Sequence, residues 1–327
     1  MKGYKVGFTW SEMKNKIAWV FCLTFMGCAN LQNKKASEAI QPANTPIMLS
    51  CEMVNHLCYL KGAYNTVSNL WLVLDTGSSQ SVLNSSKKDL LGLKPVNAGR
   101  AGGPGNDDSS NYLEFNSIDV FAENKLLLKN QNIISLPFDY VSKQNGHPTD
   151  GTLGANIFLN YSVAIDYVQN TVTLDKPGAW KSIKKEESIP ITLNDSVPVV
   201  NASILLPGGK KLEGKFLIDS GQSGVELVIF EAFLKTHREL SQYQNSKVKE
   251  VLVVGGKSKF QYGEIPNLKI GSFVISKLMT IFPIGAAGVY SEPGLAGAIG
   301  ADVLSRFHVV FDYASNRMIL SPGIDSR

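Results

Sequence analysis

Short apolar runs of strand length recur along the whole chain, and turn-forming residues separate them. Examples in the first half are residues 57–60, 70–74 and 118–121, each bounded by Gly, Asn or Asp nearby. Runs of this length with such boundaries are typical of β-strands. The pattern therefore predicts an all-β protein.

One of these runs ends on an acidic residue. The apolar residues 70–74 lead directly into Asp75, which is followed by Thr76 and Gly77. A glycine permits a tight turn, and small hydroxyl residues bond the backbone of such turns. Because a carboxylate at the end of a buried strand is costly unless it is hydrogen-bonded or shared, Asp75 is a candidate functional residue.

The same arrangement returns in the second half. Residues 214–218 form an apolar strand that leads into Asp219, Ser220 and Gly221, and Asp219 lies 144 positions after Asp75. Two acids, each in a turn made of an acid, a hydroxyl residue and a glycine, form a candidate pair.

Two further landmarks repeat in the same register, which indicates an internal duplication. Residues 190–193 match residues 46–49 at an offset of 144, and residues 297–302 match residues 151–156 at an offset of 146. Each copy is too long for a solenoid repeat. The sequence therefore predicts two similar β-barrel-like lobes with a cleft between them. The predicted boundaries are an N-terminal lobe over 46–180, a linker over 181–189 and a C-terminal lobe over 190–327.

The N-terminus carries the pattern of an export signal. Lys14 and Lys16 precede the apolar run 17–26, which is too short for a comfortable membrane span, and Gly27-Cys28 follows. This predicts a signal peptide over residues 1–28, with translation beginning at Met1 or Met13. The Gly27-Cys28 pair resembles a bacterial lipoprotein signal, which makes Cys28 the lipidation site; the alternative is that Cys28 is an ordinary residue of the signal core.

The expected location follows from this signal. The polar residues 29–45 read as a flexible tether between the anchor and the first lobe. The protein is expected to be exported and held on the outer membrane by an N-terminal lipid, facing the periplasm or the cell surface.

Composition and charge narrow the function. The chain has 327 residues and a net charge of +4, and its Lys and Arg residues are spread out, so nothing indicates nucleic-acid binding. Cys51 and Cys58 are expected to form a cross-strand disulfide or to remain two free buried thiols. No second pair of Cys or His stands at ligand spacing, so neither a metal site nor a cofactor is expected.

The chemistry of the acid pair follows from elementary electrostatics. Two carboxylates brought together cannot both ionise easily, so they share one proton. Such a pair can take a proton from water and give one to a carbonyl oxygen, as amide hydrolysis requires. The hydroxyls of Thr76 and Ser220 would fix the two turns against each other, and Gly77 and Gly221 would let the backbones approach.

The two turns resemble the active-site turns of the aspartic proteases, both pepsin-like and retropepsin-like. Leu153-Gly154 and Ile299-Gly300 are similar to the apolar-Gly element that packs beneath each active-site loop in that family. The resemblance covers residues 46 to about 320 and implies a bacterial, two-lobed form in a single chain. It implies two β-lobes, catalytic Asp75 and Asp219 on either side of a cleft, and hairpin flaps above them.

The flaps and the exact function leave alternatives. The glycine-rich residues 102–105 and 253–257 are expected to be flap tips or ordinary surface loops. The resemblance implies an aspartic endopeptidase that acts on peptide or protein substrates, and a monomer is the default because one chain holds both acids. The alternatives are a non-catalytic peptide-binding lipoprotein that retains the fold and a purely structural envelope protein.

Overall fold

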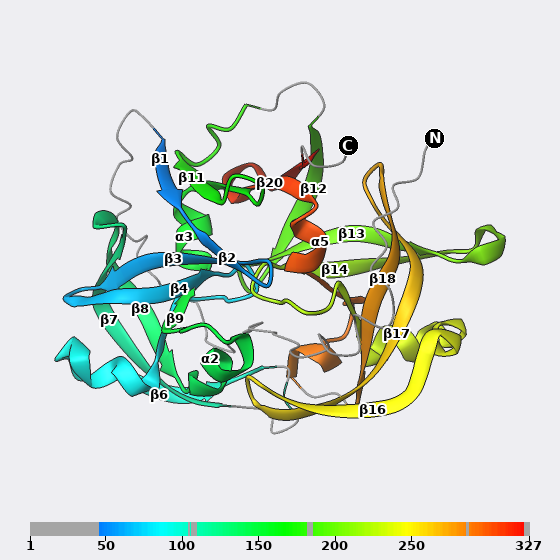
Figure 1. The fold of residues 1–327 in the computed structure, drawn as a ribbon, viewed down its shortest axis with the longest axis horizontal. Helices are drawn as coiled ribbons and strands as arrows, with labels where there is room; N and C mark the ends of the chain where they lie inside the picture. The colour runs from blue at the N-terminus through cyan, green and yellow to red at the C-terminus, as the bar shows by residue number, and fades with distance from the viewer. Residues whose placement is uncertain (1–45, 104, 106–109, 182–185, 286–287, 324–327) are drawn as a thin grey trace.

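The computed structural model describes residues 46–323, apart from 104, 106–109, 182–185 and 286–287. The described part consists mainly of β-strands, which form two lobes that lie side by side (Figure 1). The prediction of an all-β protein with two similar lobes is confirmed.

The N-terminal lobe is built on one sheet, which has eight strands in the described part of the chain. In spatial order its strands are β2 (Glu52–Val54), β3 (Leu57–Tyr64), β4 (Val67–Leu74), β9 (Gly151–Leu153), β5 (Val82–Asn84), β8 (Lys125–Leu136), β7 (Ser110–Ala122) and β6 (Asn97–Ala101).

The second sheet contains the C-terminal lobe and a segment shared by both lobes, with thirteen strands among the described residues. Their order is β1 (Ile47–Ser50), β11 (Thr171–Asp175), β10 (Ser162–Asp166), β20 (Phe307–Asp312), β21 (Arg317–Pro322), β12 (Glu187–Asn194), β13 (Val197–Leu205), β14 (Lys211–Asp219), β19 (Gly297–Gly300), β15 (Leu227–Ile229), β18 (Phe273–Ile284), β17 (Gly256–Ile270) and β16 (Gln244–Val253).

The helices are short and lie between strands. The α-helices are α2 (Asp139–Asn145), α3 (Ala155–Asn160), α4 (Glu231–Thr236) and α5 (Ala301–Leu304); the 3-10 turns are η1 (Ser85–Leu91), η2 (Pro207–Gly209), η3 (Arg238–Tyr243), η4 (Gly288–Ser291) and η5 (Tyr313–Ser315).

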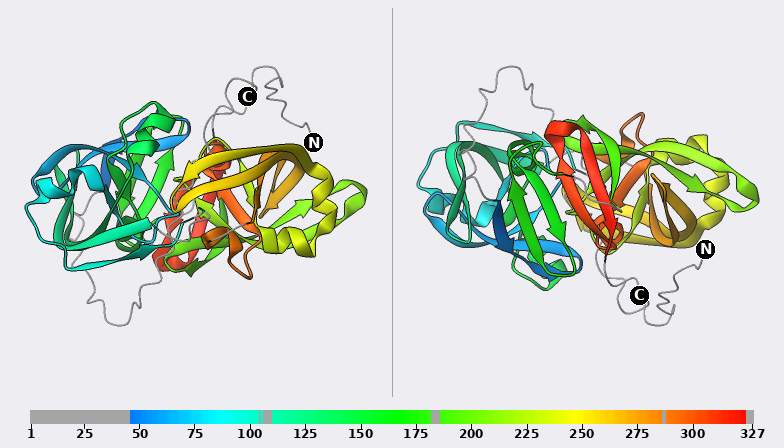
Figure 2. Two further views of the ribbon diagram at one scale, coloured as in Figure 1. Left: turned by 90° about the horizontal axis from the view of Figure 1, so that it is seen from below. Right: turned by 90° about the horizontal axis from the view of Figure 1, so that it is seen from above.

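The first six strands of the second sheet join the two halves of the chain. β1, β11 and β10 come from the first half, and β10 pairs antiparallel with β20 from the second. Figure 2 shows these strands in the middle of the molecule, between the lobes. The buried and half-buried residues alternate along β11, as expected for a strand with one face on the core. This shared sheet fixes the position of one lobe relative to the other.

A short, fully buried strand lies beside each acid-bearing strand. β9 runs parallel to β4, and β19 runs parallel to β14. All residues of β9 and β19 are buried, and all except Thr152 of β9 are glycine or apolar, as expected for strands covered on both faces. These two strands therefore support the ends of β4 and β14, where the acids lie.

The chain becomes a strand again inside the segment expected to be a linker. β12 begins at Glu187, within residues 181–189, because Glu187 pairs with Leu320 of β21. The short helix expected after Gly154 is α3, and α5 follows Gly300 in the same way.

Cys51 and Cys58 are free, buried thiols that contact each other, so the second alternative describes the structure and the disulfide is not formed. The reason lies in the register of the β2–β3 hairpin. Cys58 pairs with Met53, so Cys51 lies diagonally across the hairpin from it. Directly opposed positions are the usual places for a cross-strand disulfide, and these two cysteines do not form such a pair.

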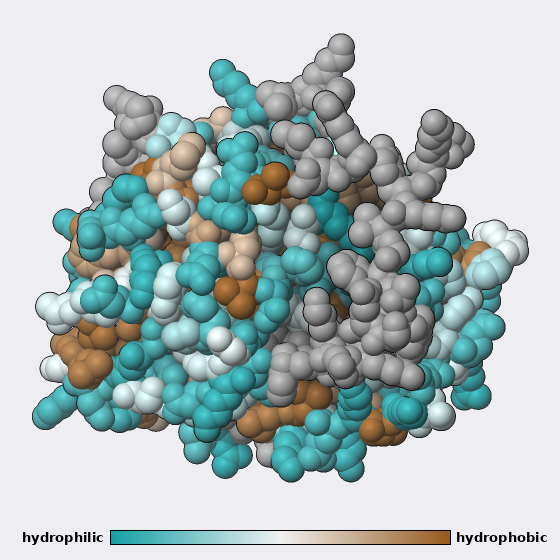
Figure 3. Space-filling view, in the orientation of Figure 1, coloured by the Kyte–Doolittle hydropathy of each residue, from teal (hydrophilic) through white to brown (hydrophobic). Residues whose placement is uncertain are grey.

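The surface is that of a protein that buries most of its apolar side chains. Figure 3 shows a face where hydrophilic residues predominate and apolar residues occur in separate small groups. Within the described residues, no helix is both long enough and apolar enough to cross a membrane. The predicted signal peptide, Cys28 and the tether lie outside the described residues.

Candidate active site

The structure brings the two acid turns together between the lobes. Asp75 follows the last residue of β4, and its backbone N–H donates to Leu153 O of β9 at 3.0 Å. Asp219 is the last residue of β14 and pairs with Gly300 of β19. Both side chains are fully buried, with 0% exposure. The parallel strand in each lobe therefore holds each carboxylate at the same point of its sheet.

A reciprocal set of hydrogen bonds joins the two turns. The Thr76 N–H donates to Ser220 Oγ at 3.0 Å, and the Ser220 N–H donates to Thr76 Oγ1 at 2.9 Å. Each hydroxyl then donates across the interface: Thr76 Oγ1 to Ile218 O at 2.8 Å and Ser220 Oγ to Leu74 O at 2.9 Å. All four bonds connect one lobe to the other, and two of them mirror the other two. This network fixes the distance between the two acids.

The glycines of the turns make room for the opposite carboxylate. A Cβ on Gly77 would lie 2.5 Å from the carboxyl carbon of Asp219, and a Cβ on Gly221 would overlap the carboxyl group of Asp75 in the same way. Each glycine N–H also donates to the acid of its own turn, at 2.8 Å to Asp75 Oδ1 and 2.9 Å to Asp219 Oδ1. Any larger residue would push the two carboxylates apart.

The electrostatics of the pair favour a shared proton. Burial raises the pKa of Asp75 well above its usual value, and the negative charge of Asp219 raises it further. The N–H groups of Gly77 and Ser78 oppose this rise by donating to the carboxylate. Because two buried like charges disfavour each other, this arrangement favours one proton held between the two acids, and such a pair can serve as acid and base together.

Two hairpins meet at their tips. The β6–β7 hairpin of the N-terminal lobe and the β16–β17 hairpin of the C-terminal lobe approach each other at the bottom of Figure 1. The Gly105 N–H donates to Val254 O at 2.9 Å, and Gly103 packs directly against Val254. The residues expected to form flap tips, 102–105 and 253–257, thus lie at this contact wherever they are described.

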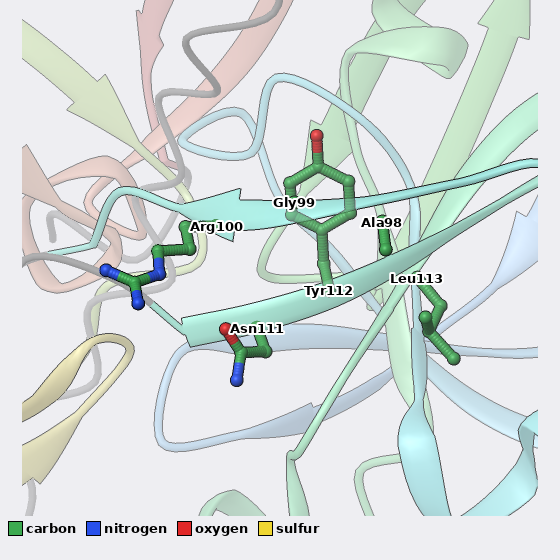
Figure 4. Close-up of a pocket in the computed structure, with 6 residues that line it drawn as sticks. All are labelled: Ala98, Gly99, Arg100, Asn111, Tyr112 and Leu113. Atoms are coloured by element: carbon green, nitrogen blue, oxygen red, sulfur yellow. The ribbon is translucent and has the colours of Figure 1, made fainter.

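The open depression in Figure 4 belongs to one of these hairpins alone. It is lined by residues of β6 and β7, namely Ala98, Gly99, Arg100, Asn111, Tyr112 and Leu113. The Tyr112 ring crosses its strand partner Gly99, where a Cβ would lie 2.6 Å from the Tyr112 hydroxyl. This depression includes neither acid, so it is a surface feature of the hairpin.

Other acids that repeat or stand near the turns have structural partners. Asp150 accepts a hydrogen bond from the Trp71 N–H at 2.8 Å and forms an ion pair with Lys87 at 3.2 Å. Asp312 is buried and bonds Arg317 Nε at 2.9 Å. Among the described residues, no group of three or more His, Cys, Asp or Glu is arranged to hold a metal ion.

Three buried polar residues near the acids did not emerge from the sequence. Ser78, the third residue after Asp75, donates its hydroxyl to Gln80 O at 2.7 Å. At the equivalent position after Asp219, Gln222 is fully buried and neither polar atom of its amide has a partner among the described residues. Thr152 of β9 is also fully buried, and its hydroxyl has no such partner. Their positions in the repeat could have drawn attention to them: Ser78 and Gln222 each lie three residues after an acid, and Thr152 lies two residues before Gly154.

No protein-family model and no curated protein sequence matches the chain. Among solved structures, the chain is similar to the aspartic proteinase from Irpex lacteus, with a TM-score of 0.53 and 16% identity. That match covers 86% of this chain and 98% of the other. Basic 7S globulin from soybean matches with a TM-score of 0.45 and 13% identity, covering 85% of this chain and 95% of the other. The likeness to the fungal enzyme establishes the all-β, two-lobed fold of the aspartic proteases.

Proposed function

We propose that the protein is an aspartic endopeptidase of a bacterial, single-chain form, in which Asp75 and Asp219 hydrolyse peptide bonds. The observation that carries this proposal is the reciprocal network of Thr76 and Ser220, which holds two buried carboxylates together. Burial and the charge of Asp219 raise the pKa of Asp75. A site built only for stability would gain nothing from placing two acids where they destabilise each other.

The reaction follows from the shared proton. The ionised member of the pair takes a proton from a water molecule, and the resulting hydroxide attacks the carbonyl carbon of the scissile amide. The protonated member gives its proton to the carbonyl oxygen, which yields a neutral tetrahedral intermediate. The acid that has gained the water proton then gives a proton to the amide nitrogen, while the other acid takes a proton from a hydroxyl of the intermediate. The C–N bond breaks, a carboxylic acid and an amine leave, and the pair again holds one proton. Because the pair titrates as a unit, neither acid has a fixed role at the outset.

The substrate and location are part of the same proposal. The substrate is a peptide or protein that lies between the acid pair and the hairpin tips. The protein acts as an exported lipoprotein, anchored to the outer membrane through Cys28, and as a monomer because both acids belong to one chain.

A digest of a peptide library tests the proposal. The purified protein, Asp75→Asn and Asp219→Asn are compared from acid to neutral pH, with and without the statine-type inhibitor pepstatin. Each Asn variant is expected to lose cleavage by at least about 1,000-fold while remaining folded, because it cannot act as a base. Parent-like cleavage by either variant would disprove the acid pair. Inhibitor binding by a folded parent that cuts no peptide would instead support the peptide-binding alternative.

A further inference from the structure

A row of paired residues crosses the N-terminal sheet on the face that carries the acid. Val73 lies two positions before Asp75, so both side chains project from the same face of the sheet. The ladder between β4 and β9 continues up to the acid through the Asp75 N–H. Val73 pairs with Thr152 of β9, and Thr152 pairs with Val82 of β5. The side chains of this row therefore lie beside Asp75.

The C-terminal lobe carries the equivalent row. Leu217 lies two positions before Asp219 and pairs with Ala298 of β19, which pairs in turn with Val228 of β15. The internal duplication thus places Leu217, Ala298 and Val228 where the first lobe has Val73, Thr152 and Val82. The two rows flank the acid pair from opposite sides.

Both rows reach towards the hairpin tips. Val73 and Val82 belong to an apolar cluster that includes Val254, from the tip of the opposite lobe's hairpin. Leu217, Ala298 and Val228 belong to a second cluster, which includes Val253 of that same hairpin. A peptide held between the acids and the tips would therefore meet one row on each side.

One position distinguishes the rows. Where the C-terminal row has Ala298, the N-terminal row has Thr152, whose hydroxyl is buried without a hydrogen-bond partner among the described residues. A valine has the same shape as threonine and would avoid the cost of an unpaired hydroxyl in an apolar row. The amide of Gln222 belongs to the turn after Asp219, packs against Gly300 and is not a member of either row.

We propose that Thr152 determines specificity, by hydrogen bonding a substrate side chain next to the scissile bond. In an extended peptide, neighbouring side chains point to opposite sides, so the two residues flanking the bond enter opposite lobes. The side chain that enters the N-terminal lobe is a hydroxyl or carboxamide residue: Ser, Thr, Asn or Gln. The side chain that enters the C-terminal lobe is aliphatic or aromatic. This inference rests on the proposed endopeptidase activity and names its substrate class.

The test uses the full-length protein and a peptide library in which the residues on both sides of the cleaved bond vary. Mass spectrometry locates each cut. At one of the two flanking positions, the parent is expected to cleave Thr and Asn peptides about tenfold faster than matched Val and Leu peptides, as one net hydrogen bond allows. Thr152→Val should abolish this preference, so that the ratio of the Thr and Asn rates to the Val and Leu rates falls from about ten to about one.

Two further variants separate the proposal from a structural role of Thr152. Ser135→Ala is the matched control, because Ser135 is a buried hydroxyl in the same lobe without a described partner. Ser135 follows Ile134, which pairs with Val82 of the row, so the Ser135 side chain lies on the opposite face of the sheet. It should keep the parent preference. Ala298→Ser should add a preference for hydroxyl or carboxamide residues at the other flanking position.

Each outcome is decisive. A preference that survives in Thr152→Val, or a parent that cleaves without any polar preference, overturns the role of Thr152 while the endopeptidase stands. Absence of any cleavage that depends on Asp75 overturns the proposed function, and the role of Thr152 falls with it.

Discussion

The turn after Asp75 and the turn after Asp219 make equivalent hydrogen bonds to each other, yet each is supported differently within its own lobe. In the first turn, Gly154 packs against the backbone oxygen of Gln80. In the second, Gly300 packs against the Nε2 atom of Gln222. The segment that follows the acid is also longer in the second lobe. Val228 of β15, a member of the C-terminal row, lies nine residues after Asp219, whereas Val82 of β5, its counterpart in the N-terminal row, lies seven residues after Asp75.

The difference shows where the two copies depend on each other. Hydrogen bonds that cross between lobes need a matching group in each copy, so Thr76 and Ser220 are chemically alike. The residues that support each turn within its own lobe need no matching group in the other lobe. Ser78 and Gln222, which occupy equivalent positions after the two acids, can therefore differ. Symmetry in this molecule is therefore greatest at the contact between the acid turns.

The largest expected effect comes from removing a hydroxyl of that contact. Thr76→Val leaves the Ser220 N–H without its acceptor and Ile218 O without its donor, each at a cost of about 1–3 kcal/mol in the free energy of unfolding. Ser220→Ala orphans Thr76 N–H and Leu74 O in the same way. Urea unfolding should show losses of similar size in the two variants. Ser135→Ala, which breaks no described hydrogen bond, should change stability by less than about 1 kcal/mol. Clearly unequal losses would show that the network is not symmetric.

A smaller effect is expected from the asymmetric position. Gln222→Met keeps the volume of the side chain and removes two buried polar atoms that have no described partner. The variant should be as stable as the parent or more stable, by up to about 1–3 kcal/mol, because an unpaired buried amide is costly. Thermal and urea unfolding measure the change. A loss of more than about 1 kcal/mol would mean that the amide has a partner and supports the turn. Ser78→Ala serves as the counterpart, since it loses a bond to Gln80 O and should be destabilised.

The smallest effect concerns the helices after the two glycines. Asn156 of α3 accepts from the Ser81 N–H at 2.7 Å, and Asp302 of α5 accepts from the Gly224 N–H at 2.8 Å, so both support the loop after their acid. Asp302 carries a charge as well, and its other oxygen pairs with His56 of the N-terminal lobe at 3.0 Å. Only the second helix therefore has a pH-sensitive contact with the other lobe.

The pH dependence of that contact has a defined sign. The hydrogen bond to Asp302 raises the pKa of His56, against desolvation and the nearby charge of Arg306. The stabilisation is therefore complete below the usual His pKa of 6.5 and is lost as the pH rises through the higher value of the folded protein. His56→Gln should lower stability at pH 6 by less than about 1 kcal/mol, because the side chain is half-exposed, and should have a smaller effect at pH 9. An equal loss at both pH values would rule out a charged pair.

The sequence was sufficient for the fold because the duplication appears as repeated landmarks in one register. The pairing of the two acid turns could be predicted for the same reason. Asp75 and Asp219 occupy the same position in the two copies of the repeat, and two such acids at the ends of buried strands are best explained if they lie close together. The choice between a disulfide and free thiols at Cys51 and Cys58, the strand at Glu187 and the row position of Thr152 could not be predicted. Each depends on strand register or on a partner more than a hundred residues away, which local patterns do not contain.

The shared sheet has a consequence for when the acid pair is assembled. Its strand β10 pairs with β20, and the network at the acids needs Ser220, so neither half of the chain can assemble the acid pair alone. Contacts this distant in sequence form late in folding. A chain that is still being synthesised therefore holds two separate, ordinary aspartates. The acid pair that we propose as catalytic is therefore assembled only when the last strands join the shared sheet.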